Sequence, residues 1–248
     1  RSDFSDAELT ESELNELKDL LDDNDIKDIC SLTPSQEGVY AQYFQSNDTK
    51  TYQLQNLCRI SKETDLETLQ KSVELLSQRH AVLKSAFTVL KSTGAIKQVV
   101  LQNRKPEFTV LTRNEAYNEE TLDKIVNEDT EKSLDLQKDS LFRVAIVDFT
   151  DARFMLLHTH HIIIDGWCFP VIINDLQKYY GELAKGISIE ELTDEIEKEV
   201  SSKTSYAEYV NWIRNQDKNE VSGYWQNLLS DCEISHIFGK EKKESNLL

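Results

Sequence analysis

One stretch of the chain is a run of apolar residues that ends in a cluster of histidines. The hydrophobic pattern in and after this run predicts a strand followed by a helix. The run 154–163 is apolar except near its end, where His158, His160 and His161 lie. In a strand, alternate side chains face opposite ways, so His158 and His160 share one face and His161 takes the other. Apolar residues at helical spacing then predict a helix over 166–184.

The rest of the chain shows the same two patterns of apolar residues, strand alternation and helical spacing. We expect further strands at 51–60, 82–90, 96–101, 108–111 and 141–149, and helices at 2–28, 33–44, 64–78, 119–134, 206–216 and 219–229. Residues 187–203 look like an acidic connection without a clear apolar face. Together these elements predict a two-layer α/β sandwich with helices packed on a mixed β-sheet.

Composition narrows the classes of protein that fit. The chain has 248 residues, of which 39% are hydrophobic and 29% charged, and its net charge of −17 argues against binding to nucleic acid or to an anionic membrane. It contains no apolar run long enough to span a membrane and no signal-peptide pattern at its start, so we expect a cytoplasmic protein. Its four cysteines lack metal-site spacing, which favours reduced thiols.

The histidines are the candidates for chemistry. An imidazole titrates near neutrality and can take up and return a proton at cellular pH. His160 and His161 point apart in a strand, which argues against a shared metal, so no bound metal is expected. Asp165 and Gly166 suit a loop that bends back toward the strand end, where the carboxylate could hold an imidazole.

Four short strings carry a resemblance to a known family. His160-His161-Ile-Ile-Ile-Asp165-Gly166 resembles the His-His-x-x-x-Asp-Gly motif of condensation domains in nonribosomal peptide synthetases, which belong to the chloramphenicol acetyltransferase-like superfamily. Three further strings resemble other motifs of the family and follow its order: Leu32-Thr-Pro-Ser-Gln36-Glu37-Gly38, Arg79-His80-Ala-Val-Leu-Lys84-Ser-Ala-Phe87 and Tyr206-Ala-Glu-Tyr209-Val-Asn-Trp212. One match alone would be unspecific, whereas four in order are a strong signal.

The resemblance implies a domain organisation. Residues 29–239 would form the N-terminal lobe of a chloramphenicol acetyltransferase-like fold, and residues 240–248 a loose tail. Motifs that the family places in its C-terminal half have no counterpart, so the C-terminal lobe is expected to be absent. Residues 1–28 resemble an acidic linker that follows an upstream domain, often an epimerisation domain.

The resemblance also implies roles for single residues. His161 would be the catalytic imidazole, acting as a general base toward an amine or as a group that orients the amine and stabilises the tetrahedral species. His160 would give structural support, and Gly166 would allow close approach of the backbone. Asp165 would pair with Arg79 in a bidentate clamp that fixes the loop.

Two further positions belong to the implied substrate tunnel between the lobes. Gln36 lies in the helix that borders this tunnel in the family, and Trp167 follows the Asp-Gly pair. The string Asp165-Gly-Trp167-Cys168-Phe-Pro170, with the opening motif, resembles the subtype that accepts a D-configured donor.

The implied reaction joins two carrier-bound substrates. An acceptor amine would attack a donor aminoacyl or peptidyl thioester, giving an amide and a free thiol. No cofactor would bind directly, because the substrates arrive on phosphopantetheine arms of upstream donor and downstream acceptor carrier domains. Adenylation domains, and possibly an epimerisation domain, would be neighbours. Without the second lobe we expect little activity from the chain alone.

Three alternatives remain open on the sequence. An epimerisation domain shares the fold and the histidine motif but inverts an α-carbon while using one loaded carrier. A non-catalytic lobe that docks a partner protein would not need an intact His161 and Asp165. A metal hydrolase is suggested only by the number of histidines and would need bound metal.

Overall fold

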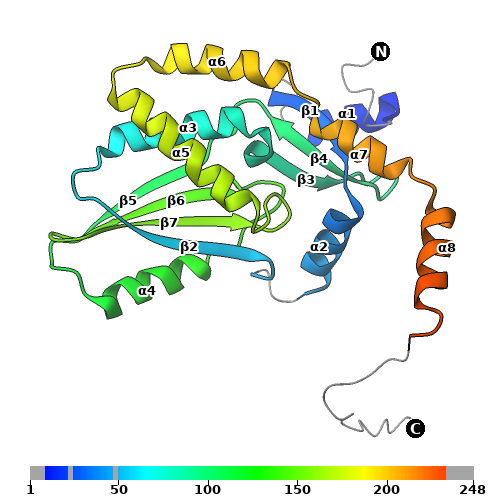
Figure 1. Cartoon of the computed structure of the whole chain (residues 1–248), viewed down its shortest axis with the longest axis horizontal. Coiled ribbons are helices and arrows are strands. Elements are labelled where there is room, and N and C mark those ends of the chain that lie inside the picture. Colours follow the sequence, from blue (N-terminus) through cyan, green and yellow to red (C-terminus); the bar gives the residue numbers. More distant parts are fainter. Residues whose placement is uncertain (1–8, 22–24, 47–49, 233–248) are drawn as a thin grey trace, which may run out of the picture.

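Two β-sheets with helices packed against them form the fold, seen in a computed structural model that describes residues 9–21, 25–46 and 50–232 (Figure 1). The larger sheet has the strand order β2 (Gln53–Ile60), β7 (Arg153–His160), β6 (Phe142–Asp148) and β5 (Glu107–Thr112). The smaller sheet has the order β1 (Ile26–Ser31), β4 (Ile96–Leu101) and β3 (Ser85–Val89). Only the β5–β6 pair is parallel among these strands, so the larger sheet is mixed.

Helices precede, connect and follow the strands. They are α1 (Glu11–Leu20), α2 (Pro34–Gln45), α3 (Leu66–Arg79), α4 (Glu119–Thr130), α5 (Cys168–Ala184), α6 (Ile189–Ser201), α7 (Tyr206–Arg214) and α8 (Lys218–Leu229). A 3₁₀ turn, Ala81–Lys84, occupies the start of the predicted strand 82–90. The predicted α/β fold with helices packed on a mixed sheet is confirmed.

The larger sheet is covered on both faces, which adds one layer to the predicted two. Met155 and Leu157 of β7 face α3 and α5 and join the main core, together with Leu76 of α3 and Leu176 of α5. Phe154 faces the other way and belongs to a separate core cluster with the buried side of α4. Figure 1 shows α3 and α5 above the sheet and α4 below it. The alternation along β7 therefore separates two cores.

The N-terminal segment differs from the predicted helix over residues 2–28. The helix α1 begins after a Thr10 cap and ends at Leu20, and β1 follows as an edge strand paired with β4. Leu17 is fully buried in a cluster with residues of the smaller sheet, so α1 is packed rather than solvated. Residues 2–8 and 22–24 lie outside the described residues, and so does the predicted tail from residue 240.

The predicted acidic connection 187–203 is wrong, because these residues form α6. Leu192 and Ile196 of α6 are buried, and Ile189 and Val200 pack against the main core. These positions follow helical spacing, which the many intervening acidic residues obscure. Ser188 caps the helix by accepting the Glu191 N–H, and α6 packs on α3.

The last two helices carry exposed aromatic side chains. Ala207 and Val210 of α7 are buried with Cys30 of β1, whereas α8 has no buried residue. Trp212 is 61% and Trp225 is 52% exposed, so neither tryptophan is packed inside the part of the chain that the structure describes. Among those residues no helix is long and apolar enough to cross a membrane.

Candidate active site

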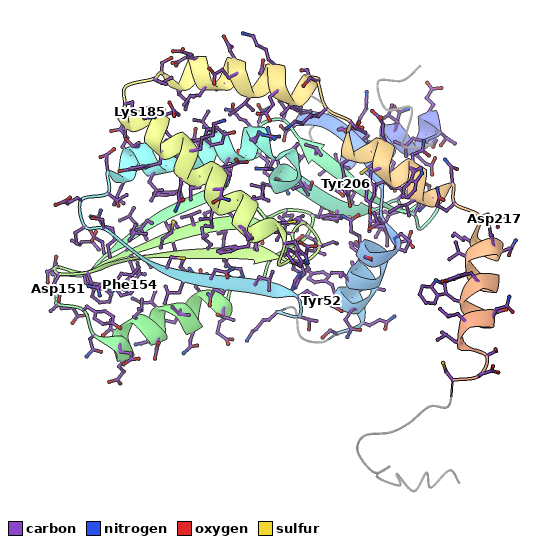
Figure 2. The ribbon with its side chains drawn as sticks, viewed as in Figure 1. Tyr52, Asp151, Phe154, Lys185, Tyr206 and Asp217 are labelled. Atoms are coloured by element: carbon purple, nitrogen blue, oxygen red, sulfur yellow. The ribbon has the colours of Figure 1, made fainter. Side chains whose placement is uncertain are left out.

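The histidine motif lies where β7 ends, and the end of the strand separates the two adjacent imidazoles. His160 is the last residue of β7 and is 0% exposed, whereas His161 begins a turn and is exposed. The strand ends before the predicted Ile163. Tyr52, which directly precedes β2, marks the same end of the larger sheet, far from Asp151 (Figure 2). One ring thus packs inside the protein while the other reaches the surface.

Two carbonyl groups hold His161. The backbone N–H of His161 donates to the Tyr52 carbonyl at 2.8 Å, and Nδ1 lies 3.1 Å from the Ile164 carbonyl. Because a carbonyl oxygen can only accept, Nδ1 carries the proton in this arrangement, which leaves the lone pair of the neutral ring on Nε2. Within the described part of the chain, Nε2 makes no hydrogen bond, so it is free to accept a proton from a substrate.

His160 supports the turn from inside. Its Nδ1 accepts the backbone N–H of Ile162 at 3.1 Å, and its ring meets the Tyr43 ring of α2 edge-on. Burial, followed by the neighbouring His161, lowers the pKa of His160 from 6.5 to about 4. The ring is therefore neutral at cellular pH, as its acceptor role at Nδ1 requires.

Gln36 ties the turn to two other segments of the chain. Its Nε2 donates to the Ile162 carbonyl and to Gln98 Oε1, both at 3.0 Å, and its Oε1 accepts the Thr33 N–H at 3.1 Å. The Tyr206 hydroxyl lies 3.4 Å from the same oxygen. Gln36 is 7% exposed. The amide is therefore used inside the protein, and the predicted place of Gln36 beside a substrate tunnel stays a prediction.

The predicted clamp between Arg79 and Asp165 is wrong for the described residues. Arg79 NH2 instead lies 3.0 Å from Glu199 Oε1 of α6, an element that the sequence did not predict. Asp165 is exposed, and its Oδ1 accepts the backbone N–H groups of Trp167 and Cys168 at 3.0 Å each. Hydrogen bonds from Cys168 and then Trp167 lower the pKa of Asp165. Asp165 thus binds the backbone where α5 begins and does not hold the His161 ring.

Gly166 and Trp167 lie on the open side of the turn. A Cβ built on Gly166 would meet no atom within 4 Å, so the predicted close backbone approach has no partner in the described part of the chain. The Trp167 side chain is 88% exposed, and its proposed role in a tunnel stays a prediction. The space around both residues leaves His161 accessible.

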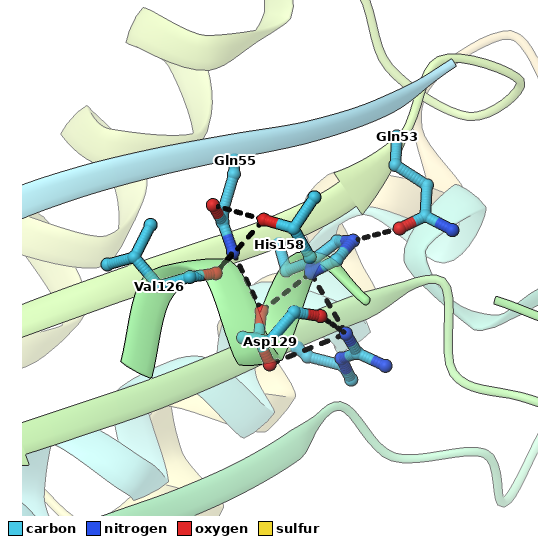
Figure 3. A network of polar contacts seen from close by, with 7 residues as sticks. Gln53, Gln55, Val126, Asp129 and His158 are labelled. Atoms are coloured by element: carbon cyan, nitrogen blue, oxygen red, sulfur yellow. Dashed lines mark hydrogen bonds and ion pairs between the residues drawn. The ribbon is translucent and has the colours of Figure 1, made fainter. Parts of the chain in front are cut away.

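A buried polar network lies beneath this end of the sheet (Figure 3). Gln55, His158 and Arg143 face one another across β2, β7 and β6, and Asp129 of α4 meets this row. His158 Nδ1 is 2.7 Å from Asp129 Oδ2, and His158 Nε2 is 2.8 Å from Gln53 Oε1. Burial acts to raise the pKa of Asp129, but hydrogen bonds from His158 and Gln55 outweigh it and lower the pKa. The network fastens α4 and β2 to the strand that carries the motif.

Some of these groups could not be identified from the sequence. No pattern marks Tyr52 or the Ile164 carbonyl as partners of His161. Gln98 gave a weak signal, because it is a polar residue in an apolar strand, and it is 2% exposed.

In the part of the chain that the structure describes, no group of three or more His, Cys, Asp or Glu residues is placed to hold a metal ion.

Comparisons with known proteins agree with this geometry. The family model described as "Condensation domain" matches residues 26–246. Tyrocidine synthase 3 of Brevibacillus parabrevis is 32% identical over 221 residues, which are 88% of this chain and 3% of the synthase. The chain therefore spans a small part of this relative.

Solved structures show the same fold at lower identity. The starter condensation domain of the rhizomide synthetase superposes with a TM-score of 0.64 at 13% identity, covering 83% of this chain and 49% of that one. The epimerization domain from the third module of tyrocidine synthetase B gives a TM-score of 0.68 at 20% identity, covering 84% of this chain and 46% of that one. The chain corresponds to about half of each solved structure.

The Gln36 network generates a prediction about stability. Replacing Gln36 by leucine leaves the Ile162 carbonyl, the Gln98 side-chain carbonyl and the Thr33 N–H without their buried partner. We expect Gln36→Leu to lower the free energy of unfolding by about 2 kcal/mol or more. The same change at exposed Gln42 of α2 is the matched control and should cost less than about 0.5 kcal/mol. Urea unfolding followed by circular dichroism measures both, and equal losses would contradict the network.

The buried His160 generates a prediction about pH. Its pKa is about 4 in the folded chain and 6.5 as its ordinary value, so between these pH values the unfolded chain binds more protons. The stability that the neutral ring contributes is complete above about pH 6.5 and is lost as the pH falls toward 4. His160→Gln should flatten the dependence of unfolding free energy on pH in this window. NMR of the ring carbons provides the direct check, and titration of His160 near pH 6.5 would contradict the assignment.

Proposed function

The chain belongs to the condensation-domain family, and we propose that it supplies the histidine-bearing lobe of a site that forms amide bonds in nonribosomal peptide synthesis. The donor is an aminoacyl or peptidyl thioester and the acceptor is the amine of a second aminoacyl thioester. We further propose that the donor residue has the D configuration, which the strings around Gln36 and Trp167 favour.

One observation carries this proposal: the exposed His161 has its Nδ1 3.1 Å from the Ile164 carbonyl, while its Nε2 makes no hydrogen bond within the described residues. In the reaction, the acceptor nitrogen attacks the thioester carbonyl carbon and forms the C–N bond. His161 Nε2 accepts the proton that the nitrogen loses. The C–S bond then breaks, and the departing sulfur takes the proton back from the imidazole. The products are an amide and a thiol, and the imidazole returns to its starting state.

The Ile164 carbonyl supports this role in two ways. As a hydrogen-bond acceptor 3.1 Å from Nδ1, it fixes the tautomer that has its lone pair on Nε2. It also stabilises the imidazolium that forms when Nε2 takes the proton, because the positive ring donates more strongly at Nδ1. The same contacts would serve a ring that only orients the amine.

The substrates and partners follow from the same proposal. Both substrates would arrive on phosphopantetheine arms of carrier domains, so the chain would bind no cofactor of its own. A second lobe would close the site opposite His161. Exposed apolar side chains of α7 and α8 support an interface of this kind, and they are Tyr206, Tyr209, Trp212, Tyr224, Trp225, Leu228 and Leu229.

Epimerisation is the second candidate, because the solved epimerization domain superposes as closely as the condensation domain does. The two reactions differ in what they consume. Epimerisation needs one loaded carrier and exchanges the α-proton with solvent, whereas condensation needs two loaded carriers and releases one thiol. Deuterium uptake into a single carrier-bound substrate, without amide formation, would favour epimerisation.

The proposed role of His161 is tested in a two-lobed domain that contains this chain. With both carriers loaded, His161→Ala and His161→Gln should lower amide formation by roughly 10²- to 10⁴-fold, since proton transfer is lost. Mass spectrometry of the carrier-bound product measures the rate, and circular dichroism checks folding. Parallel reactions with D- and L-configured donors test the subtype. Wild-type rates in both variants would remove His161 from the reaction and favour a docking lobe.

The chain alone should fold but show little or no condensation. Well-oriented reactants gain on the order of 7 to 11 kcal/mol from positioning, and an open site loses much of that gain. The measurement is the same assay with the 248-residue chain in place of the two-lobed domain. Turnover comparable to the two-lobed domain would show that one lobe is sufficient or that two copies complete the site.

A further inference from the structure

Tyr52 has an unusual backbone conformation next to the histidine motif. Its φ is +69°, and it is the only residue other than glycine with a positive φ in the described part of the chain. Bulky L-residues rarely adopt this left-handed region, because the side chain crowds the backbone. Such conformations persist only where surrounding contacts hold them, and they cluster at functional sites.

The contacts of Tyr52 converge on His161. The Tyr52 carbonyl accepts the His161 N–H at 2.8 Å. The two rings meet edge to face, with centroids 6.3 Å apart and planes at 85°. The next residue, Gln53, begins β2 and pairs with His160 in register. The left-handed conformation thus lies at the point where the chain enters the strand, directly opposite the turn that begins at His161.

Packing alone does not explain a tyrosine in this place. The side chain is 38% exposed, and its hydroxyl makes no hydrogen bond within the described residues. Glycine would adopt the same backbone conformation without strain and would keep the carbonyl in place. What tyrosine adds is the ring that lies against the His161 imidazole.

We propose that Tyr52 is a positioning residue for His161: its strained backbone aims a carbonyl at the His161 N–H while its ring restricts the rotation of the imidazole. With the ring in place, Nδ1 stays on the Ile164 carbonyl and Nε2 keeps its lone pair toward the substrate. Without it, the exposed imidazole turns about its side-chain bonds and exchanges between tautomers. This inference rests on the proposed function of His161 and names the residue that orients it.

Three substitutions separate the ring, the hydroxyl and the backbone. Tyr52→Phe keeps the ring and removes the hydroxyl. Tyr52→Gly removes the ring and relieves the left-handed strain, whereas Tyr52→Ala removes the ring and retains a Cβ. Tyr117→Ala is the matched control, because Tyr117 is also 38% exposed and has an edge-to-face aromatic contact, with Phe149.

The first readout is spectroscopic and uses the chain itself. Nitrogen-15 shifts of the His161 ring report which nitrogen carries the proton. Wild type, Tyr52→Phe and Tyr117→Ala should show a proton held at Nδ1, whereas Tyr52→Gly and Tyr52→Ala should show averaged tautomers. Tyr52→Gly should melt no lower than wild type, since it removes strain. An unchanged His161 tautomer in Tyr52→Gly would overturn the proposal.

The second readout is kinetic and uses the two-lobed domain. Loss of the Tyr52 ring should lower kcat on the order of ten- to hundredfold, because the His161 imidazole is then misaligned. KM should change little, because substrate binding is not affected. The kcat of Tyr52→Phe should stay within about twofold of the wild-type kcat, because this conservative variant keeps the ring. A fall in kcat that follows the loss of melting temperature across all four variants would show a merely structural role and overturn the proposal.

The two readouts distinguish this inference from the proposed function. If His161→Ala leaves amide formation unchanged, the proposed function fails, yet the ring shifts still decide whether Tyr52 positions His161. If His161→Ala abolishes amide formation while Tyr52→Gly retains both the wild-type tautomer and the wild-type kcat, the proposed function stands and the inference about Tyr52 is wrong.

Discussion

The structure around the motif depends on one constraint: three consecutive isoleucines are buried in a turn that is part of neither β-sheet. Ile162, Ile163 and Ile164 are 2%, 8% and 6% exposed. A buried backbone must have its N–H and C=O groups satisfied, and outside a sheet it needs partners from elsewhere. The His160 ring accepts the Ile162 N–H, and the His160 carbonyl accepts the Ile163 N–H. The side chains of Gln36 and His161 donate to the carbonyls at the two ends of the run.

These partners come from segments that are distant in the sequence. Gln36 reaches the Ile162 carbonyl across 126 positions, and it also bonds Gln98, whose amide continues to Ser85. The first and third motif strings therefore meet at the buried amide of Gln36. The second string reaches this amide through Gln98, and the fourth reaches it through the Tyr206 hydroxyl. The three buried isoleucines anchor the turn. The polar groups that bond the turn's backbone fix the direction in which the His161 side chain points.

The sequence was sufficient for the elements with clear periodicity and insufficient for the polar contacts between them. Strand alternation predicted that the rings of His160 and His161 would separate, and helical spacing predicted α3 and α5 within a few residues. Acidic residues hid the apolar stripe of α6, so Glu199 was not recognised as a partner of Arg79, which the family resemblance paired with Asp165. Hydrogen bonds between distant segments depend on side-chain directions in three dimensions, and one-dimensional patterns do not record these directions.

The Asp165 carboxylate at the start of α5 limits how charge can be balanced during the proposed reaction. A helix N-terminus usually offers free N–H groups to an anion. Here Asp165 already accepts those of Trp167 and Cys168, and Pro170 has none. In the proposed reaction, a negative oxygen at this end of the helix would therefore lie close to a carboxylate and could not use the N–H groups of Trp167 and Cys168. Stabilisation of that oxygen must then come from groups other than these two N–H groups, which separates it from proton transfer at His161.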